Sequence, residues 1–437
     1  PDGKTITFKL RQGVNWHDGK PFTSADVQYT AMEMWKKHLN YGTALQLYLE
    51  GVDTPDAHTA VFRYSRPMPM DLMLRAMSDL GYIAPKHVYE GSNVLENPAN
   101  TAPIGTGPFK FSKYERGQYV IAVRNENYWR EPAKVDEVVM RQVGDAVAQA
   151  QLLQSGQADV AMNIDPETAK TLTGPNVKTE SAPSNNFVYL TISPGAVANP
   201  VPMTPDIREA ISISVDREAL IEFTLGEGNG RLISVPFPLD FPGGSGHSIP
   251  EYNPEKAKEI LAKAGHADGF TLDAIYPNLN VYGVDFTLAM QKIQQDLDKV
   301  NIKLKLQPVE FPNWRELATK DHIPISFVFF APDYYGTSQY VGYFGLAPDS
   351  PWAARGGAER DPSFLLPESK TMLAEALKSS PEQAEKIYFD IGEKIKAQNV
   401  LIPMISPNTI LAYGSKVHGV RNSPSSNVPL YEISIDD

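Results

Sequence analysis

The sequence predicts an α/β protein of two or three domains. Between residues 254 and 330, runs with the period of a helix alternate with short runs rich in β-branched and aromatic residues. Such alternation is typical of strands that share one sheet with helices on its faces. A shorter series over residues 138–164, in the order strand, helix, strand, predicts a βαβ unit. A chain of 437 residues holds two or three domains at roughly 100 to 200 residues each.

The first 135 residues have the pattern of an α+β unit. Thr5–Leu10 alternates polar and apolar residues, which predicts a half-buried strand. Thr23 precedes a run with helical spacing, and an acid, Asp26, follows in the first turn, as at a helix N-terminus. Gly105–Pro108 contains a GxG pattern, but no helical run follows it, so we expect a tight turn and not a phosphate-binding loop.

Further helix starts are marked by proline directly after a capping side chain. Proline is tolerated at the first helical position because its φ is already helical and its missing N–H would have no partner there. The four pairs are Asp165-Pro166, Thr204-Pro205, Asn253-Pro254 and Ser380-Pro381. From residue 254, the expected helices are 254–264, 284–299 and 312–320, and the expected strands are 270–276, 302–309 and 323–330. Dense glycine and proline over residues 226–246 indicate a domain boundary just before these elements.

Composition and missing motifs argue against several kinds of protein. The net charge of −12 disfavours nucleic acid as a partner, and the lack of cysteine excludes disulfides and thiolate zinc sites. The patterns HExxH, GxSxG and GxxxxGK[ST] are absent from the sequence. Asp53, Asp56 and His58 are better explained by a turn at Pro55 than by a metal site. The residues therefore supply no catalytic motif, no cofactor or metal site, and no feature that favours nucleic acid as a partner.

The stretch 323–352 is the candidate ligand-binding region. An apolar strand ends at Phe330, and the loop that follows holds Asp333 among several aromatic residues. Ligands of open α/β sheets bind beyond the carboxyl ends of strands, which is where Asp333 stands. A carboxylate framed by rings suits a cationic or amphipathic solute. The alternative is that these rings only pack within their own domain.

Five segments, taken in chain order, resemble a known family. They are Val14–Val27, Gly105–Phe109, Asn125–Trp129, Pro205–Ile211 with Asp216-Arg217, and Tyr252–Lys258. Together they are similar to the extracytoplasmic solute-binding proteins of peptide and nickel ABC importers, bacterial family 5. The resemblance implies a two-lobed periplasmic-binding-protein fold, the venus flytrap, with an extra α+β subdomain on the first lobe. It also implies a binding protein and not an enzyme, which works with a membrane permease in the periplasm, or outside the cytoplasm on a membrane tether. We expect this protein to be a monomer without a cofactor.

The same resemblance assigns the site. Peptide binders of the family have a pattern similar to Trp-x-Ala-Asp-Tyr, and Phe330–Tyr334 departs from it at Phe330 and Pro332 but keeps the acid that holds a peptide's amino terminus. The histidine that nickel binders use near this loop is absent here. Across the cleft, Ser184–Asn186 resembles the segment that hydrogen-bonds the ligand backbone. Apart from the resemblance, Arg355 is the nearest cation downstream of Asp333 and a candidate partner for a ligand carboxylate, with an ordinary surface arginine as the alternative. The expected ligand-binding residues are Phe330, Asp333, Tyr334, Tyr335, Ser184, Asn185, Asn186 and Arg355.

The resemblance also predicts how the chain divides. Residues 1–135 should form the extra subdomain, 136–235 with 407–437 the core of lobe 1, and 236–406 lobe 2, with strand 400–406 as the return crossing. Family members carry several tens of residues before Thr5–Leu10, and without them we expect an unpaired strand edge in lobe 1 unless another chain covers it. The expected solute is a short peptide or another amine-bearing molecule. An oligosaccharide or opine-type solute is the alternative, and a glycoside-hydrolase-like enzyme is a remote one.

Overall fold

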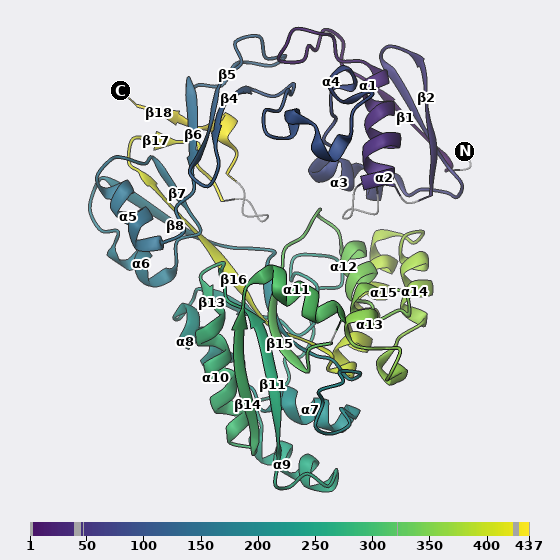
Figure 1. The fold of residues 1–437 in the computed structure, drawn as a ribbon, viewed down its shortest axis with the longest axis vertical. Coiled ribbons are helices and arrows are strands. Elements are labelled where there is room, and N and C mark those ends of the chain that lie inside the picture. Colours follow the sequence, from purple (N-terminus) through teal and green to yellow (C-terminus); the bar gives the residue numbers. More distant parts are fainter. Residues whose placement is uncertain (1–2, 39–44, 47, 321, 423–427, 437) are drawn as a thin grey trace.

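A large mixed sheet forms the lower part of the molecule (Figure 1). The computed structural model describes residues 3–38, 45–46, 48–320, 322–422 and 428–436. The order of the main strands is β10-β16-β9-β15-β11-β14, and β11 runs parallel to β14 and β15 whereas β9 runs antiparallel to β15 and β16. Their bounds are β9 Phe187–Ile192, β10 Gly230–Leu232, β11 Phe270–Pro277, β14 Ile302–Val309, β15 Ile325–Phe330 and β16 Leu401–Gly414.

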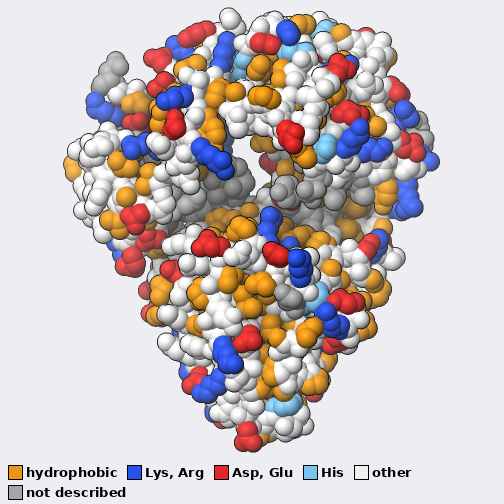
Figure 2. Space-filling view, viewed as in Figure 1, with side chains coloured by type: hydrophobic (Ala, Val, Ile, Leu, Met, Phe, Trp, Pro, Cys, Tyr) orange, Lys and Arg blue, Asp and Glu red, His pale blue; other side chains and the backbone are white. Residues whose placement is uncertain are grey.

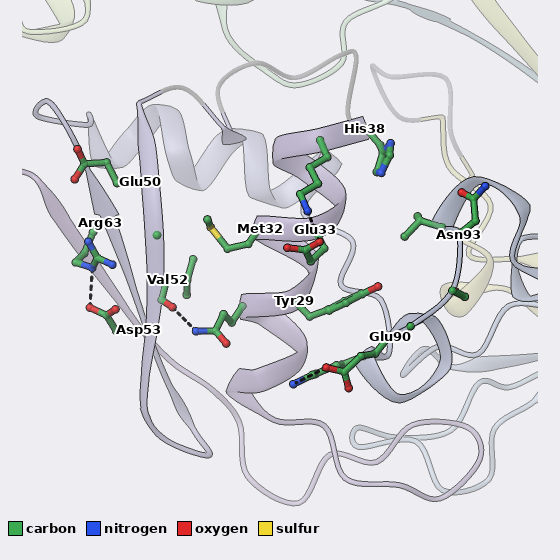
Figure 3. A pocket seen from close by; sticks show the side chains of 17 residues that line it. Tyr29, Met32, Glu33, His38, Glu50, Val52, Asp53, Arg63, Glu90 and Asn93 are labelled. Atoms are coloured by element: carbon green, nitrogen blue, oxygen red, sulfur yellow. Dashed lines mark hydrogen bonds and ion pairs between the residues drawn. The ribbon is translucent and has the colours of Figure 1, made fainter.

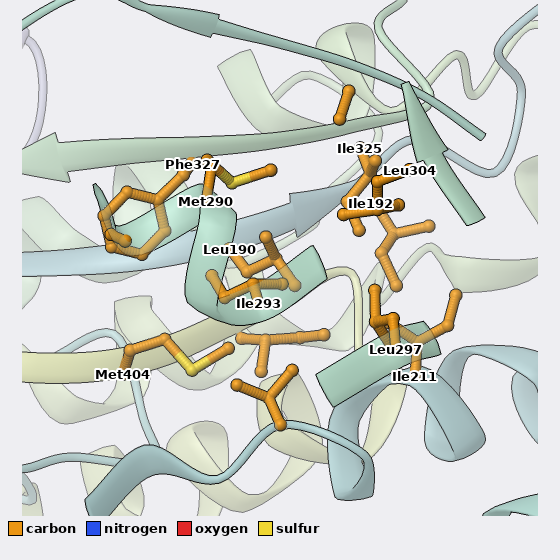
Figure 4. Packing of buried hydrophobic residues seen from close by; sticks show 14 of the residues in the cluster. Leu190, Ile192, Ile211, Met290, Ile293, Leu297, Leu304, Ile325, Phe327 and Met404 are labelled. Carbon is orange, nitrogen blue, oxygen red and sulfur yellow. The ribbon is translucent and has the colours of Figure 1, made fainter. Parts of the chain in front are cut away.

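Helices cover both faces of this sheet because its central strands are apolar on both sides. All six residues of β9 are buried, and they alternate between two hydrophobic clusters: Val188 and Leu190 belong to one, Phe187 and Tyr189 to the other. Figure 4 shows the first cluster, in which side chains of the sheet meet those of α10. Helices of the first cluster are α7 Pro205–Ile213, α8 Arg217–Leu225, α9 Pro254–Lys263 and α10 Phe286–Asp298. Helices around the second are α11 Phe311–Lys320, α12 Thr337–Phe344, α13 Pro351–Arg355, α14 Glu368–Ala376 and α15 Pro381–Gln398.

Three smaller units lie above this sheet in Figure 1. The N-terminal subdomain contains the sheet β1-β3-β2 with a buried core of its own. Its elements are β1 Thr5–Lys9, α1 Ser24–Tyr29, the π-helix Thr30–Trp35, α2 Lys36–His38, β2 Leu49–Asp56, β3 Thr59–Tyr64, α3 Met70–Leu80 and α4 Lys86–Tyr89, with 3₁₀ turns at Val94–Glu96 and Pro98–Asn100. A second sheet holds β4 Phe109–Glu115, β5 Tyr119–Arg124 and β6 Glu137–Arg141. The third unit holds α5 Ala146–Gln154, β7 Val160–Met162, α6 Pro166–Thr171 and β8 Val177–Pro183.

Short elements complete the described chain. They are the hairpin β12 Asn280–Val281 with β13 Val284–Asp285, the pair β17 Val417–His418 with β18 Ser434–Ile435, and the 3₁₀ turns Pro362–Phe364 and Leu430–Glu432.

The chain crosses between the upper and lower parts along two neighbouring paths. β8 ends at Pro183 in the upper part, and β9 begins at Phe187 in the lower part. β16 runs beside both, pairing through Leu401–Ile405 with β9 and through Asn408–Gly414 with β8. The expected return crossing at 400–406 is therefore the first half of a strand that belongs to both parts.

Most local elements agree with the sequence, and the helix starts agree best. The side chains of Asp165, Thr204, Asn253 and Ser380 each accept a hydrogen bond from the backbone of the first turn, with proline following. The expected elements from residue 254 to 330 are also confirmed within a few residues.

The expected grouping of elements was wrong in three places. Residues 187–232, assigned to lobe 1, lie in the large sheet, because β9 pairs with β15 and β10 pairs with β16. Residues 109–135, assigned to the extra subdomain, supply β4 and β5, which form a sheet with β6 in the order β4-β5-β6 and do not pair with β1–β3. The expected βαβ unit is not formed, since β6 pairs with β5 and β7 pairs with β16. In each case the pairing joins segments that are far apart in the sequence or on opposite sides of an expected boundary.

The glycine turn at 105–108 is fixed by a histidine. The Gly105 N–H donates to Nδ1 of His17 at 3.1 Å, so the ring proton is on Nε2, which donates to the Gly107 carbonyl at 3.0 Å. Burial lowers the pKa of His17, against an opposing effect of that carbonyl. Only the neutral ring can accept the Gly105 N–H, whereas the Nε2–H donation to Gly107 and the backbone hydrogen bond from the His17 N–H to the Gly105 carbonyl do not require it.

This geometry predicts a loss of stability in mild acid. Because the pKa of His17 is lowered in the folded protein, its neutral form stabilises the fold above pH 6.5, and this contribution is lost as the pH falls from there through the folded pKa. Thermal unfolding measured between pH 7.5 and pH 5 should show a fall in Tm that is smaller in His17→Gln, which cannot titrate. Equal falls in both proteins would contradict the prediction.

Candidate functional site

The candidate site lies at the strand ends of the large sheet, on the side of the sheet that faces the upper part of the molecule. β15 ends at Phe330, which pairs with Phe187 at the start of β9. The loop with Asp333 and the segment 184–186 therefore meet at one edge, from strands that are neighbours. Figure 2 shows an opening between this edge and the upper units. The two groups of residues that the sequence placed in one site are thus brought together.

Asp333 is a partly buried carboxylate without a partner in the described part of the chain. Its backbone N–H donates to Oε1 of Gln339 at 2.8 Å, and no described donor reaches its side chain. Burial raises the pKa of Asp333. A carboxylate in this state accepts a cationic donor readily, because the loss of water is not compensated by the protein.

Aromatic rings form the wall behind this carboxylate. The ring centroids of Phe330 and Tyr340 are 5.3 Å apart, and Phe187 lies 6.0 Å from each. Burial, and next the charge of Asp333, raise the pKa of Tyr340 well above its usual range. The buried Tyr340 hydroxyl finds no hydrogen-bond partner among the described residues. Tyr340 was not among the expected ligand-binding residues, because the sequence did not show that the helix Thr337–Phe344 turns its ring back towards Phe330.

The segment 184–186 combines a structural hydroxyl with an amide. Ser184 Oγ donates to the Pro407 carbonyl at 2.6 Å, and the Ser184 carbonyl accepts from Ser406 Oγ at 3.0 Å. Ser184 thereby ties the two crossing strands together. Asn185 is 3% exposed, and its buried Oδ1 has no hydrogen-bond partner within the described residues. Asn186 is buried beside them at 1% exposure.

Tyr334 and Tyr335 do not line the same wall. Tyr334 is 5% exposed and packs in the core of the N-terminal subdomain, and burial raises its pKa to about 12. Tyr335 is exposed, with its hydroxyl donating to the Asp240 carbonyl at 2.7 Å and its ring 4.3 Å from that of Phe241. Both rings are engaged by protein groups.

Arg355 lies elsewhere in the lower part of the molecule. Its carbonyl accepts from Ser193 Oγ, beyond the end of β9 that is opposite to Phe187. Its guanidinium donates to the Tyr343 hydroxyl at 2.7 Å and lies 5.0 Å from the ring centroid of Trp352. The structure therefore gives Arg355 an aromatic cage and does not bring its main chain to the edge where Asp333 stands.

A wide hollow lies on the N-terminal subdomain, and Asp333 is not among the residues that line it. Its volume is about 790 Å³, and Figure 3 shows the residues of α1, the π-helix and β2 that line it. Its carboxylates are largely neutralised in place, because Glu33 pairs with Lys37 and Asp53 with Arg63. Paired surface charges around a wide hollow do not single out a ligand, so we place the site at Asp333.

Two further searches bear on other kinds of site. The described residues contain no group of three or more His, Asp or Glu that could hold a metal ion. Within the same ranges, none of the helices combines the length and apolar character that a membrane crossing requires.

Comparison with known families identifies the chain. Residues 1–352 match the model of the bacterial extracellular solute-binding proteins, family 5. The chain belongs to this family. Its members are the binding proteins of ABC importers, so the protein is an extracytoplasmic solute-binding protein and not an enzyme. The resemblance seen in the sequence is thus confirmed.

Similar proteins agree with this family and its fold. A dipeptide-binding protein of Pseudomonas aeruginosa is 26% identical over 468 residues, covering 99% of this chain and 84% of the relative. The structure of the oligopeptide-binding protein AppA from Bacillus subtilis in complex with a nonapeptide has a TM-score of 0.83 at 21% identity, with 100% and 88% of the chains covered. AgaA of A. tumefaciens R10 in complex with agropinic acid has a TM-score of 0.80 at 22% identity, with 100% and 88% covered. The two-lobed periplasmic-binding-protein fold is therefore confirmed.

The carboxylate of Asp333 should cost the ligand-free protein stability. Its raised pKa means that the folded state favours the protonated acid, so stability falls as the pH rises from 3.8 through the folded pKa. At pH 7, Asp333→Asn should therefore raise the Tm of the ligand-free protein by roughly 1 to 2 °C, measured by calorimetry. A lower Tm would mean that the protein itself supplies a donor to this carboxylate.

Proposed function

We propose that this protein captures a short peptide, or another amine-bearing solute, between its lobes for an ABC importer. The observation that carries the proposal is the carboxylate of Asp333, which is partly buried, has a raised pKa and lacks a donor in the described chain. A protonated amine would supply the missing charged hydrogen bond. Relatives named as dipeptide- and oligopeptide-binding proteins support this class of solute.

Neighbouring groups suit the rest of a peptide. Asn185 Oδ1 can accept from a peptide N–H, and the Tyr340 hydroxyl can bond a polar atom close to the amine. The ring of Phe330 supplies apolar surface to a side chain. The proposed contacts leave out four of the expected residues, because other protein groups already hydrogen-bond or pack against their side chains. These four are Ser184, Tyr334, Tyr335 and Arg355.

The proposal includes the setting of the protein. Lobe 1 comprises residues 1–183 with 408–437, and lobe 2 comprises 184–407, so that both crossings lie at the ends of β8, β9 and β16. The receptor acts as a monomer in the periplasm, or on a membrane tether, and hands its solute to a membrane permease. A net charge of −12 disfavours nucleic acid as a partner.

Calorimetry with defined peptides tests the proposal. Tri-alanine should bind, and acetylation of its amino terminus should weaken binding, because the acetylated nitrogen carries no charge for Asp333. Asp333→Asn should weaken tri-alanine by roughly ten- to hundred-fold, which is about 1.5 to 3 kcal/mol. As a matched control, Asp240→Asn removes a carboxylate that lies 3.3 Å from Arg231, with 57% of its side chain exposed, and it should change the affinity less than about three-fold.

Three results would contradict the proposal. They are the absence of binding for di-, tri- and tetra-alanine, equal affinities for free and acetylated peptide, and an affinity that Asp333→Asn leaves unchanged. Binding of a neutral oligosaccharide or of agropinic acid, independent of Asp333, would favour the alternative in which the rings are the main contact.

A further inference from the structure

One loop of lobe 2 enters the core of the opposite lobe. Tyr334, between β15 and α12, belongs to the buried cluster that also contains Ile6, Phe62 and Met73 of the N-terminal subdomain. Leu377, just after α14, packs against the same cluster. Two side chains of lobe 2 thus help to complete a hydrophobic core of lobe 1.

Polar contacts accompany this insertion. Arg75 of α3 donates from Nη1 to the Tyr335 carbonyl at 3.3 Å, and its guanidinium lies 5.4 Å from the centroid of the Tyr335 ring. The Tyr334 hydroxyl pairs instead with Ser338 Oγ of its own lobe at 3.1 Å. The ring of Tyr334 therefore bridges the lobes, while its hydroxyl does not.

The inserted residue is coupled to the candidate ligand contact. Asp333 and Tyr334 are consecutive, and Gln339 holds both, accepting from the Asp333 N–H and donating to the Tyr334 carbonyl. This side chain makes one rigid unit of the backbone between them. A movement of Tyr334 out of lobe 1 would therefore displace Asp333 as well.

The contact lies far from the hinge. The two crossings, β8 to β9 and β16, are at one side of the opening, and α3 meets the loop before α12 at the other side (Figure 1). Strands that cross side by side leave the lobes free to rotate about them. A contact on the far side of the opening resists that rotation most effectively.

We propose that Tyr334 is an interlobe key, a positioning residue that holds the lobes together without solute and sets Asp333 against the cleft. The assignment of Asp333 as the ligand contact rests on the proposed function, whereas the effect on lobe position does not. In the closed form the Tyr334 ring covers apolar surface of the N-terminal core, so removing the ring exposes that surface. In the open form the ring does not cover it, so the same substitution changes nothing there. The ratio of open to closed molecules should then rise on the order of ten-fold or more.

Distances between spin labels test this directly. The chain has no cysteine, so Lys20→Cys and Glu382→Cys, both at exposed positions of opposite lobes, give one specific pair of labels on the full chain. Without solute, pulsed dipolar spectroscopy should show a dominant short distance in this parent. Tyr334→Ala should shift the distribution to longer and broader distances. Tyr334→Phe keeps the ring and loses only the bond to Ser338, and it should match the parent.

Each outcome decides the proposal. A distribution for Tyr334→Ala that equals the parent's, with helix content retained by circular dichroism, would overturn it, and so would a shift of equal size in Tyr334→Phe. If Tyr334→Ala does not fold, Leu377→Ala replaces it, since Leu377 is only partly buried in the same contact. The expected result for Leu377→Ala is a smaller shift in the same direction, and no shift would overturn the proposal.

A second readout separates the key from the proposed function. With tri-alanine as the probe, Tyr334→Ala should release the peptide several-fold faster than the parent, because the opened cleft no longer holds Asp333 in place. If the parent does not bind tri-alanine, the proposed function fails, while the label distances still test the key. If the distances shift and release is unchanged, Tyr334 holds the lobes without positioning Asp333, and that part of the proposal is wrong.

Discussion

The continuity of β16 is the constraint on which the rest of the molecule depends. This strand has 14 residues, nearly all buried, and it belongs to both lobes. It changes partner from β9 to β8 between Ile405 and Asn408, at Pro407, which has no N–H to give to either ladder. The Pro407 carbonyl instead accepts the hydroxyl of Ser184, from the other crossing. Bending is therefore confined to a short stretch where two tied strands pass side by side.

That arrangement decides where a ligand can be held. The edge of the large sheet next to the crossing faces lobe 1, and both Asp333 and Asn185 lie on it. The protein keeps an ionisable group there against its own stability, because burial favours the protonated acid and no described donor compensates. The tightly packed rings of Phe187, Phe330 and Phe344 hold the backbone around this group. A core that is stable without the carboxylate can carry the cost of an unpaired site.

Local features of the fold could be predicted from the sequence, and pairing between distant segments could not. A cap and a following proline act within four residues, so Asn253 or Ser380 identifies its helix without any knowledge of the fold. β9 is buried on both faces, so its sequence reads as a strand of any central sheet, and only contact with β15 assigns it to lobe 2. Residues 109–124 were assigned to the wrong unit for the same reason, since β5 pairs with β6, a strand that comes after the expected boundary, and β4 pairs with β5.

The same limit applies to the candidate site. Asp333 could be found because strand ends of an α/β sheet are preferred ligand positions and the acid stood almost alone among aromatic residues. Tyr334 was grouped with it because the two are adjacent. Nothing in the sequence shows that this loop lies against the core of another lobe, in which the fully buried residue nearest in the chain, Ala76, precedes Tyr334 by 258 residues. Arg355 was chosen as the nearest downstream cation, yet three aromatic rings surround it.

Asp333 and Tyr334 are adjacent, but their side chains lie in different lobes, so the loop that carries them couples the position of one lobe to that of the other. The lobes are joined covalently at one side of the opening only, so a rotation about β16 is opposed mainly by what touches across the far side. There, the ring of Tyr334 is in lobe 1 while the carboxylate of Asp333 remains in lobe 2, and Gln339 binds the backbone of both. The same rigid segment of backbone therefore carries both the solute contact, made by Asp333, and the contact between the lobes, made by Tyr334. Either event restricts the same rotation, so each should lower the cost of the other, which is the thermodynamic condition for closure to be coupled to capture.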